Sequence, residues 1–434
     1  VLKNLVLLNS KYQELNEEES FKALVNQLIL LGKIDTVLEF QTEDINYLLT
    51  DYFEISDKEV DEFIKNIYST VVELGIPIVQ TVFLEHYGML ELMNATYIIT
   101  ENEGRLVVQK KAFLHETSKP FVNNINTNIS LLNKSLSKNL DSKDLQKKIY
   151  EALIVPILNL NLFKENGEDV LPIIFITNAT TQSIPFTALI DENDNYLLDS
   201  FVFIRSNSIL SLMSANEETL WNKEKPLLIA GDIQYEDNKE FSEKRIDDYG
   251  DLDNLKWSSN EVNAINKIEK NSLIKNNISE TDFKNIDFSK YRSLHFSVHG
   301  TSIFENPGKS ALFLGGDDDN DGILTVNEIR KLNLTSIDFV FLSACETNTG
   351  KRYSNLNPIT LQTAFHQAGV NSTISTLWSI DDKATAYFSE IFYLLREETE
   401  FRFLALHRAK QLFIKTYPEY KNPYYWAAFT LDGF

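Results

Sequence analysis

Cysteine is the scarcest residue of this chain, with one copy, Cys345, among 434 residues. A single cysteine excludes an intrachain disulfide and a multi-cysteine zinc site, so nothing in the sequence indicates an oxidising compartment. The chain also lacks a run of about 18 apolar residues that would span a bilayer, and it has no basic-then-apolar leader. A cytoplasmic location is therefore expected. The first residue is Val1 rather than methionine, which indicates a processed or truncated product.

Positive charge is in deficit as well. The chain has 41 Lys and Arg against 63 Asp and Glu, which gives a formal net charge of -22 at pH 7. Such a surface repels phosphate backbones and anionic lipid, so nucleic acid and membrane are not expected as direct partners. The excess acid suits a basic protein partner or a cation, and simple solubility is the other explanation.

Three regions differ in their hydrophobic pattern. Residues 1–77 have apolar residues at helical spacing and predict a helical segment, a possible remnant of a repeat or sensor region. Residues 78–170 begin with three strand-like runs and continue into two long helices, which indicates a small β-meander plus helices. Residues 171–434 alternate short apolar strands with helices, which predicts an α/β fold with a doubly wound, mostly parallel sheet flanked by helices.

The individual elements can be placed from the same pattern. The expected strands are 78–84, 95–100, 106–112, 172–177, 201–205, 227–231, 293–298, 339–343 and 372–377. The expected helices are 119–138, 142–160, 208–220, 257–268, 325–332 and 358–368. The longest irregular stretch, 234–253, is acidic and poor in glycine, and it is predicted to be a mobile surface loop.

Two strands of this sheet run into residues that can do chemistry. One strand is followed by His299 and Gly300, and another runs into Cys345. Ligands bind at the carboxyl ends of strands in such a sheet, so we expect His299 and Cys345 at the same edge. A thiol attacks as a thiolate, and a nearby imidazole is the base that takes its proton. The backbone N–H groups of Gly300 and Cys345 are the expected donors to an oxyanion.

These residues also have plain structural explanations. Free cysteine is among the most buried residue types, so Cys345 alone would not predict catalysis. The His299–Gly300 pair at a neighbouring strand end is what favours it. His295 shares a strand face with His299 and is expected to be a core or supporting histidine. The other histidines show no spacing that suits a metal site.

The segments that carry these residues resemble those of the CHAT domain, a caspase-like domain often found behind tetratricopeptide helices. The two segments are 295–300 (His-Phe-Ser-Val-His-Gly) and 342–350 (Leu-Ser-Ala-Cys-Glu-Thr-Asn-Thr-Gly). Further similar segments follow in the right order, at 184–189, 321–329, 376–382 and 422–429. The resemblance covers about residues 78–434. One departure is 353–358, where many relatives carry a Gly-Glu-Gly-like run, and it leaves the shape of a substrate-binding loop open.

The resemblance implies a fold and an activity. The fold is that of the clan of caspases, separases and gingipains, with His299 and Cys345 as the catalytic dyad and no cofactor needed for the chemistry. The activity is a cysteine endopeptidase that cleaves a partner protein, in a bacterial defence or cell-death pathway, with 1–77 as the end of a tetratricopeptide-like region. A catalytically silent caspase-fold scaffold or binding module is the alternative. A nucleotide-binding protein is not supported, because no glycine-rich phosphate loop follows any strand. The sequence indicates no oligomeric state.

Two carboxylates after the strand at 372–377 predict a specificity. The segment from Trp378 to Asp382 resembles one in separases, where an acidic residue receives a P1 arginine. We therefore expect a basic P1 residue, received by Asp382 or, as second choice, by Asp381. Either aspartate would alternatively cap a helix that starts near Lys383. With this preference, Lys351-Arg352 would be a site of self-cleavage.

Residues 317–328 match the pattern of a twelve-residue calcium loop. The expected ligands are Asp317, Asp319, Asp321, the carbonyl of Ile323, Thr325 and Glu328. The loop lies between the two dyad strands, so bound calcium would order the cleft and activate the enzyme. Against this, the preceding residues resemble a strand rather than a helix, and a solvated acidic turn is the other explanation.

Overall fold

The architecture is seen in a computed structural model of the chain. It describes residues 71, 76–85, 92–102, 105–115, 118–158, 170–177, 181–206, 224–235, 249, 252–303, 306–344, 360–399 and 401–433. Most of the helical segment expected over 1–77 lies outside these residues, as do Cys345, Lys351, Arg352 and the helix expected at 208–220.

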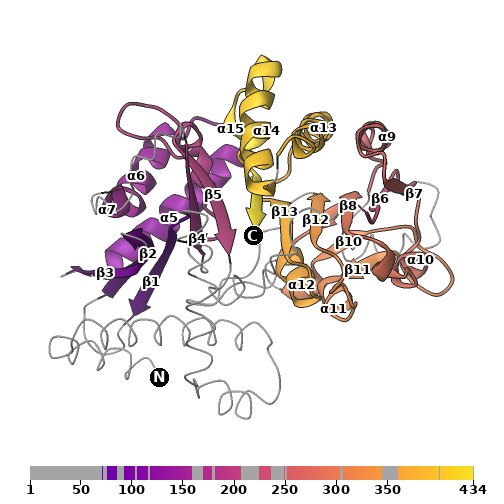
Figure 1. Ribbon diagram of the computed structural model, residues 1–434, viewed down its shortest axis with the longest axis horizontal. Coiled ribbons are helices and arrows are strands. Elements are labelled where there is room, and N and C mark those ends of the chain that lie inside the picture. The colour runs from indigo at the N-terminus through magenta and orange to yellow at the C-terminus, as the bar shows by residue number, and fades with distance from the viewer. Residues whose placement is uncertain are drawn as a thin grey trace, which may run out of the picture.

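Eleven strands of the described residues form one sheet, in the order β3-β2-β1-β4-β5-β14-β13-β12-β8-β6-β7 (Figure 1). Their bounds are β1 Ile78–Glu85, β2 Leu92–Asn102, β3 Arg105–His115, β4 Leu171–Ile176, β5 Phe201–Ser206, β6 Leu227–Gly231, β7 Ser272–Asn276, β8 Ser293–Ser297, β12 Phe339–Ser343, β13 Ser372–Thr376 and β14 Phe429–Asp432. The first three strands are an antiparallel meander, and β14 runs antiparallel to β13. The remaining pairs are parallel, which confirms the mostly parallel α/β sheet predicted from the sequence.

A second, smaller sheet follows β8 and lies beside it. Its antiparallel strands are β9 Gly300–Thr301, β10 Ala311–Phe313 and β11 Ile323–Thr325. Because β9 begins at Gly300, this sheet starts directly after His299.

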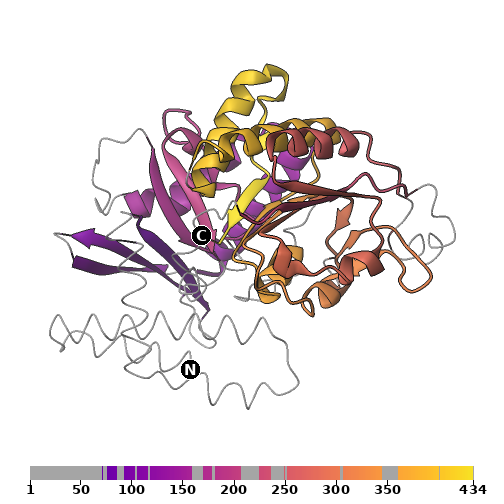
Figure 2. The same ribbon diagram turned by 45° about the vertical axis from the view of Figure 1, so that its right-hand side comes forward.

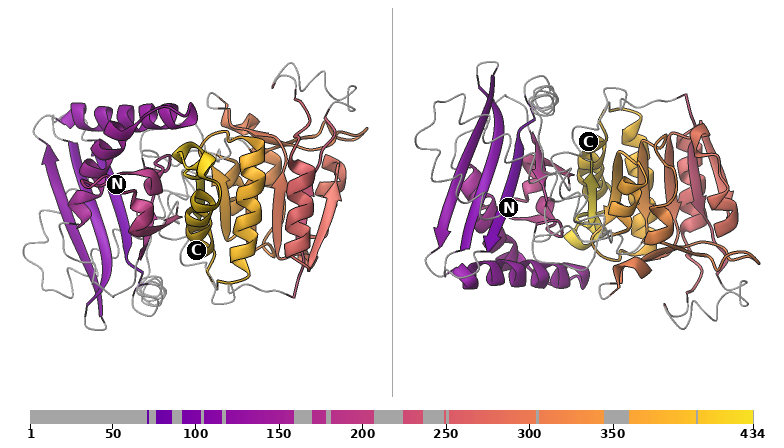
Figure 3. Two further views of the ribbon diagram at one scale, coloured as in Figure 1. Left: turned by 90° about the horizontal axis from the view of Figure 1, so that it is seen from above. Right: turned by 90° about the horizontal axis from the view of Figure 1, so that it is seen from below.

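Helices cover both faces of the main sheet (Figure 2). The described helices are α5 Ser118–Ser137, α6 Lys143–Leu153, α7 Val155–Leu158, α9 Ser258–Ile268, α10 Glu280–Lys284, α11 Val326–Ile329, α12 Leu361–Gln367, α13 Asp382–Arg396, α14 Arg402–Thr416 and α15 Pro423–Trp426. Helices α9, α13 and α14 lie side by side on one face, as the view from above shows (Figure 3). No helix among these residues is long and apolar enough to cross a bilayer.

The side chains of β12 show how the two faces are filled. Phe339 and Phe341 join one core cluster, with residues of α9, α13 and α14, whereas Val340 and Leu342 join the other, with residues of α11 and α12. This alternation follows from the period of two along a strand. By the same alternation His295 of β8 faces α9 and α13.

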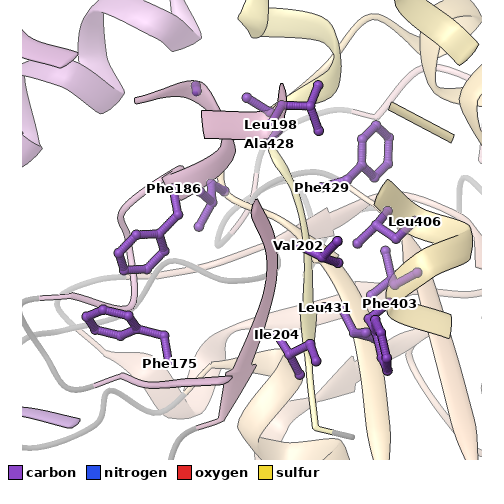
Figure 4. Packing of buried hydrophobic residues seen from close by; sticks show 14 of the residues in the cluster. Phe175, Phe186, Leu198, Val202, Ile204, Phe403, Leu406, Ala428, Phe429 and Leu431 are labelled. Atoms are coloured by element: carbon purple, nitrogen blue, oxygen red, sulfur yellow. The ribbon is translucent and has the colours of Figure 1, made fainter. Parts of the chain in front are cut away.

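The two halves of the main sheet meet where β5 lies beside β14 (Figure 4). Apolar side chains of both strands and of α14 fill this junction, among them Ile204, Leu431 and Phe403, which are all nearly fully buried. A buried ion pair spans it, with Arg205 Nε 3.6 Å from Asp432 Oδ2. The junction therefore joins the meander half and the half that carries His299 into one continuous sheet.

Candidate active site

His299 is held at the carboxyl end of β8 by its ring and its backbone. Its Nε2 lies 2.8 Å from the carbonyl oxygen of Asp253. A carbonyl oxygen only accepts hydrogen bonds, so Nε2 carries the proton of the neutral ring and Nδ1 is the basic nitrogen. The backbone N–H of His299 donates to the hydroxyl of Tyr235, 3.0 Å away. The imidazole is thus fixed in tautomer and orientation, as a general base requires.

Tyr235 and the segment around Asp253 form one frame around this histidine. The Tyr235 hydroxyl donates to the carbonyl oxygen of Phe313 at 2.9 Å, and its ring centroid lies 5.0 Å from that of His299. Its backbone N–H donates to Asn254 Oδ1 at 2.7 Å, next to Asp253. The sequence analysis missed Tyr235 and Asp253, because both fall in the stretch 234–253 that was predicted to be a surface loop. The apolar alternation of Ile233 and Tyr235 after β6 was the available signal.

We expect Tyr235→Phe to lower kcat about tenfold while the protein stays folded. The change removes one hydroxyl and leaves the Phe313 carbonyl and the His299 N–H without their partner, at a cost of about 1–3 kcal/mol. Tyr249→Phe is the matched control, because the Tyr249 hydroxyl also donates to a backbone carbonyl, that of Lys309, at 2.8 Å. Steady-state kinetics on a peptide substrate, with thermal melts of both variants, make the comparison. Equal kcat for the two variants would show that Tyr235 does not position the base.

The strand that leads to Cys345 is the neighbour of β8. β12 pairs with β8 in parallel, with Ser343 opposite Ser297, and Cys345 and His299 each follow two residues later in the sequence. Cys345 itself lies outside the described residues, so its position relative to His299 stays a prediction. The preceding residue, Ala344, is held by a hydrogen bond, because its carbonyl oxygen accepts from Thr376 Oγ1 at 2.9 Å. Gly300 opens β9 opposite Leu312, and its role as an oxyanion donor also stays a prediction.

A cavity of about 40 Å³ opens at the carboxyl ends of β8, β12 and β13. It is lined by Leu255, Val298, Ser343, Ala344, Thr376, Ile380, Asp382 and Thr385. Asp382 is the one carboxylate of this lining. The cavity wall thus includes Val298, immediately before His299, and Ala344, immediately before Cys345, whereas His299 is not part of the lining.

The structure separates the two aspartates predicted to receive P1. Asp381 is exposed and caps α13, where its Oδ1 accepts the N–H of Ala384 at 3.0 Å. Asp382 is half-buried, and its Oδ2 accepts the N–H of Trp257 at 2.7 Å, at the start of α9. Burial raises the pKa of Asp382, and the charges of Glu261 and Asp381 add to the rise, whereas the Trp257 N–H opposes it. A cation that entered the cavity would therefore find a carboxylate short of positive partners.

A buried polar network lies between β8 and the helices α9 and α13. His295, fully buried, has its Nε2 3.2 Å from Glu261 Oε1 on α9, and its Nδ1 3.2 Å from the Tyr393 hydroxyl on α13. Ser297 donates to Glu261 Oε2 at 2.6 Å. Burial acts to raise the pKa of Glu261, but the His295 ring and nearby hydroxyls outweigh it and lower the pKa overall. His295 is thus a buried supporting histidine, as expected.

Glu261 was missed by the sequence analysis, although its position gave a signal. It falls on the buried stripe of α9, with Val262 and Ile265. Gly231 at the end of β6 lets this helix approach, since a Cβ there would lie 2.7 Å from Val262 Cγ2. A charged residue on a buried helix face needs a polar partner, and this principle alone would have identified Glu261 as a member of a buried polar network.

Three carboxylates of the predicted calcium loop, those of Asp317, Asp321 and Glu328, accept hydrogen bonds from protein groups in the structure. Burial acts to raise the pKa of Asp317, but hydroxyl hydrogen bonds from Ser279 and Thr281 lower it to about 2. Glu328 accepts the Thr325 N–H and hydroxyl in a capping box and pairs with Lys284 at 2.7 Å. Across the residues that the structure describes, no three His, Cys, Asp or Glu side chains gather into a metal-binding group. Calcium binding stays a prediction, which calorimetry at millimolar calcium and activity in excess chelator would decide.

The chain resembles known proteins in sequence and in fold. The family model of the CHAT domain matches residues 143–434. None of the curated proteins matches the chain. Two crystal structures of the Saccharomyces cerevisiae separase–securin complex are similar, with TM-scores of 0.53 and 0.50 at 12% and 11% identity. Each match covers 97% of this chain and 34% of the matched chain, so this chain spans about a third of their length.

At such low identity the similarity to separase concerns the fold alone, and it confirms the caspase-like architecture expected from the sequence. The family match has a wider meaning, because it extends over more than half of the chain. The chain belongs to the CHAT domain family.

Proposed function

We propose that the protein is a cysteine endopeptidase that cleaves a partner protein through His299 and Cys345. The observation that carries the proposal is the in-register parallel pairing of β8 with β12, at whose carboxyl ends the oriented His299 imidazole and the cavity lie. The family and the separase-like fold are consistent with it.

The proposed chemistry assigns one role to each group. His299 Nδ1 takes the proton of the Cys345 thiol, and the thiolate attacks the scissile carbonyl carbon. The N–H groups of Gly300 and Cys345 stabilise the resulting oxyanion. The imidazolium then protonates the leaving amine, and a water molecule deprotonated by the same ring hydrolyses the thioester. The Asp253 carbonyl holds the Nε2–H through both steps.

The proposed specificity is for a basic P1 residue that pairs with Asp382. The cavity of about 40 Å³ has room for about three water molecules, so the cavity must widen to admit a P1 side chain of Arg or Lys. Lys351-Arg352 is then a proposed self-cleavage site. Calcium activation, a cytoplasmic location, control by a tetratricopeptide-like region and a role in bacterial defence or cell death belong to the same proposal.

A search for new protein N-termini tests the proposal directly. The protein and its Cys345→Ala variant are each added to a proteome, and the N-termini that appear with the first alone are sequenced. We expect a set of cleavages after Arg or Lys that the variant does not produce. Identical sets, with no labelling of Cys345 by a thiol-reactive peptide probe, would instead indicate the silent scaffold.

A further inference from the structure

Six aromatic side chains form a continuous, half-buried strip that starts at the edge of the cavity. In order they are Trp257, Tyr387, Tyr417, Tyr420, Tyr425 and Tyr424. Successive ring centroids lie 5.6, 4.7, 6.2, 4.7 and 4.7 Å apart. The strip runs from the start of α9, over α13 and the end of α14, to α15. We call it the aromatic strip.

The aromatic strip begins next to the cavity of the proposed active site. The backbone N–H of Trp257 donates to Asp382 in the cavity wall, and Leu255, two residues earlier, lines the same cavity. Trp257 and Tyr387 also line a groove of about 530 Å³ between α9 and α13. The groove therefore begins two residues along the chain from the cavity wall, at Trp257.

The aromatic strip already has a cation on it. Lys383 Nζ lies 5.1 Å from the ring centroid of Trp257 and 5.5 Å from that of Tyr387. These distances are typical of a cation–π interaction.

The charges of carboxylates act on two further rings, Tyr417 and Tyr420, and one of these carboxylates, Glu390, lines the same groove as Trp257 and Tyr387. Burial raises the pKa of Tyr417, and the charges of Glu390 and Glu419 add to the rise. Burial likewise raises the pKa of Tyr420, and Asp381 and Glu419 add to it. Ring faces bordered by negative charge favour Arg and Lys side chains over neutral or acidic ones.

We propose that the aromatic strip binds a segment of the protein substrate, outside the scissile bond, whose Arg or Lys side chains stack on its rings. The proposal rests on the proposed function in one respect, that the substrate is a protein. The net charge of -22 acts in the same direction, because it attracts a basic segment at long range.

Binding to the Cys345→Ala protein tests this without any turnover. The probe is a fluorescein-labelled peptide of alternating Arg and Gly, and its control is the same peptide with neutral citrulline in place of Arg. We expect anisotropy to give at least about tenfold tighter binding of the Arg peptide at low salt, and a loss of the difference at high salt.

Three substitutions in the Cys345→Ala background locate the site. Tyr420→Ala and Glu419→Lys should each weaken binding of the Arg peptide about fivefold, through loss of a ring and reversal of a charge. Lys383→Gln should strengthen it about threefold, because it frees two rings and removes a like charge. Glu151→Lys is the matched control for Glu419→Lys: it makes the same charge change at an exposed position of α6, and it should leave binding unchanged.

Turnover separates a failure of the aromatic strip from a failure of the proposed function. The substrates are a short peptide with Arg at P1 and the same peptide extended by the Arg-Gly segment. We expect Glu419→Lys to lower the ratio of kcat/KM for the long and short substrates about fivefold. If neither peptide is cut, the proposed function fails and the binding result stands by itself.

Two outcomes would overturn the proposal. One is equal binding of the Arg and citrulline peptides, or binding that Tyr420→Ala and Glu419→Lys leave unchanged. The other is self-association in sedimentation velocity that Tyr420→Ala abolishes while peptide binding is unaltered, which would assign the aromatic strip to a second copy of the chain.

Discussion

Replacing either Cys345 or His299 by alanine is expected to lower kcat/KM by about 10³-fold or more, with no change in the folded structure. The thiol is the nucleophile and the imidazole its base, so loss of either removes the same chemical step. The double variant should therefore be little worse than each single one, because the two residues act as a unit. Kinetics on a peptide with Arg at P1, with thermal melts, give all three values.

The His299→Ala variant allows a second check on the role of the ring. Free imidazole should restore part of its activity, because it can accept the thiol proton in the space that the side chain leaves. It should not restore Cys345→Ala. Turnover by Cys345→Ala above about a hundredth of the wild-type rate would refute the assignment of the nucleophile.

Asp382→Asn should abolish the preference for a basic P1 residue. Loss of one partner from a desolvated charge pair costs about 2–5 kcal/mol, which corresponds to a fall of about 30-fold or more in kcat/KM for Arg at P1. A substrate with citrulline at P1 should be nearly unaffected. The Asn side chain keeps an oxygen that can accept the Trp257 N–H, so the start of α9 should be preserved.

Asp381→Asn is the matched control, since Asp381 is exposed and caps α13 rather than lining the cavity. It should leave the Arg-to-citrulline ratio of kcat/KM unchanged. The same ratio should fall on acidification as Asp382 takes up a proton. Because burial raises the pKa of Asp382 in the free protein, this fall in the kcat/KM ratio should begin above the usual range for aspartate. If Asp381→Asn lowers this kcat/KM ratio and Asp382→Asn does not, Asp381 rather than Asp382 binds the P1 residue.

Strong hydrophobic periodicity made most of the fold predictable. Strands such as β6 and β12 are short, wholly buried and flanked by helices, and their bounds in the structure equal the predicted ones. β7 was missed because it is an edge strand with polar residues, including Lys275 and Asn276, and it carries little apolar signal. The position of β14 between β13 and β5 was not predicted, because strand order depends on contacts between distant parts of the chain.

The candidate site was predictable only where side chains carry the chemistry. His299 and Asp382 were selected as candidates because a strand end followed by such a residue is a recognisable pattern, and their roles stay predictions. The contact between His299 Nε2 and the Asp253 carbonyl oxygen could not be predicted, since any residue type can supply a backbone carbonyl. The acidic loop is a case that the pattern leaves open: its oxygen donors have calcium-loop spacing, Glu328 pairs with Lys284 in the structure, and calcium binding stays a prediction.

The junction between β5 and β14 has a consequence for how fast the chain folds. It pairs Arg205 with Asp432, two residues that are more than two hundred positions apart in the sequence. Closing so long a loop costs conformational entropy before the contacts at the junction can stabilise the chain, so such pairings form late in folding. Each half of the sheet can assemble from nearer segments, and the apolar faces at the junction stay exposed until the halves dock. Refolding should therefore show a slow final phase during which dilution protects the chain from aggregation.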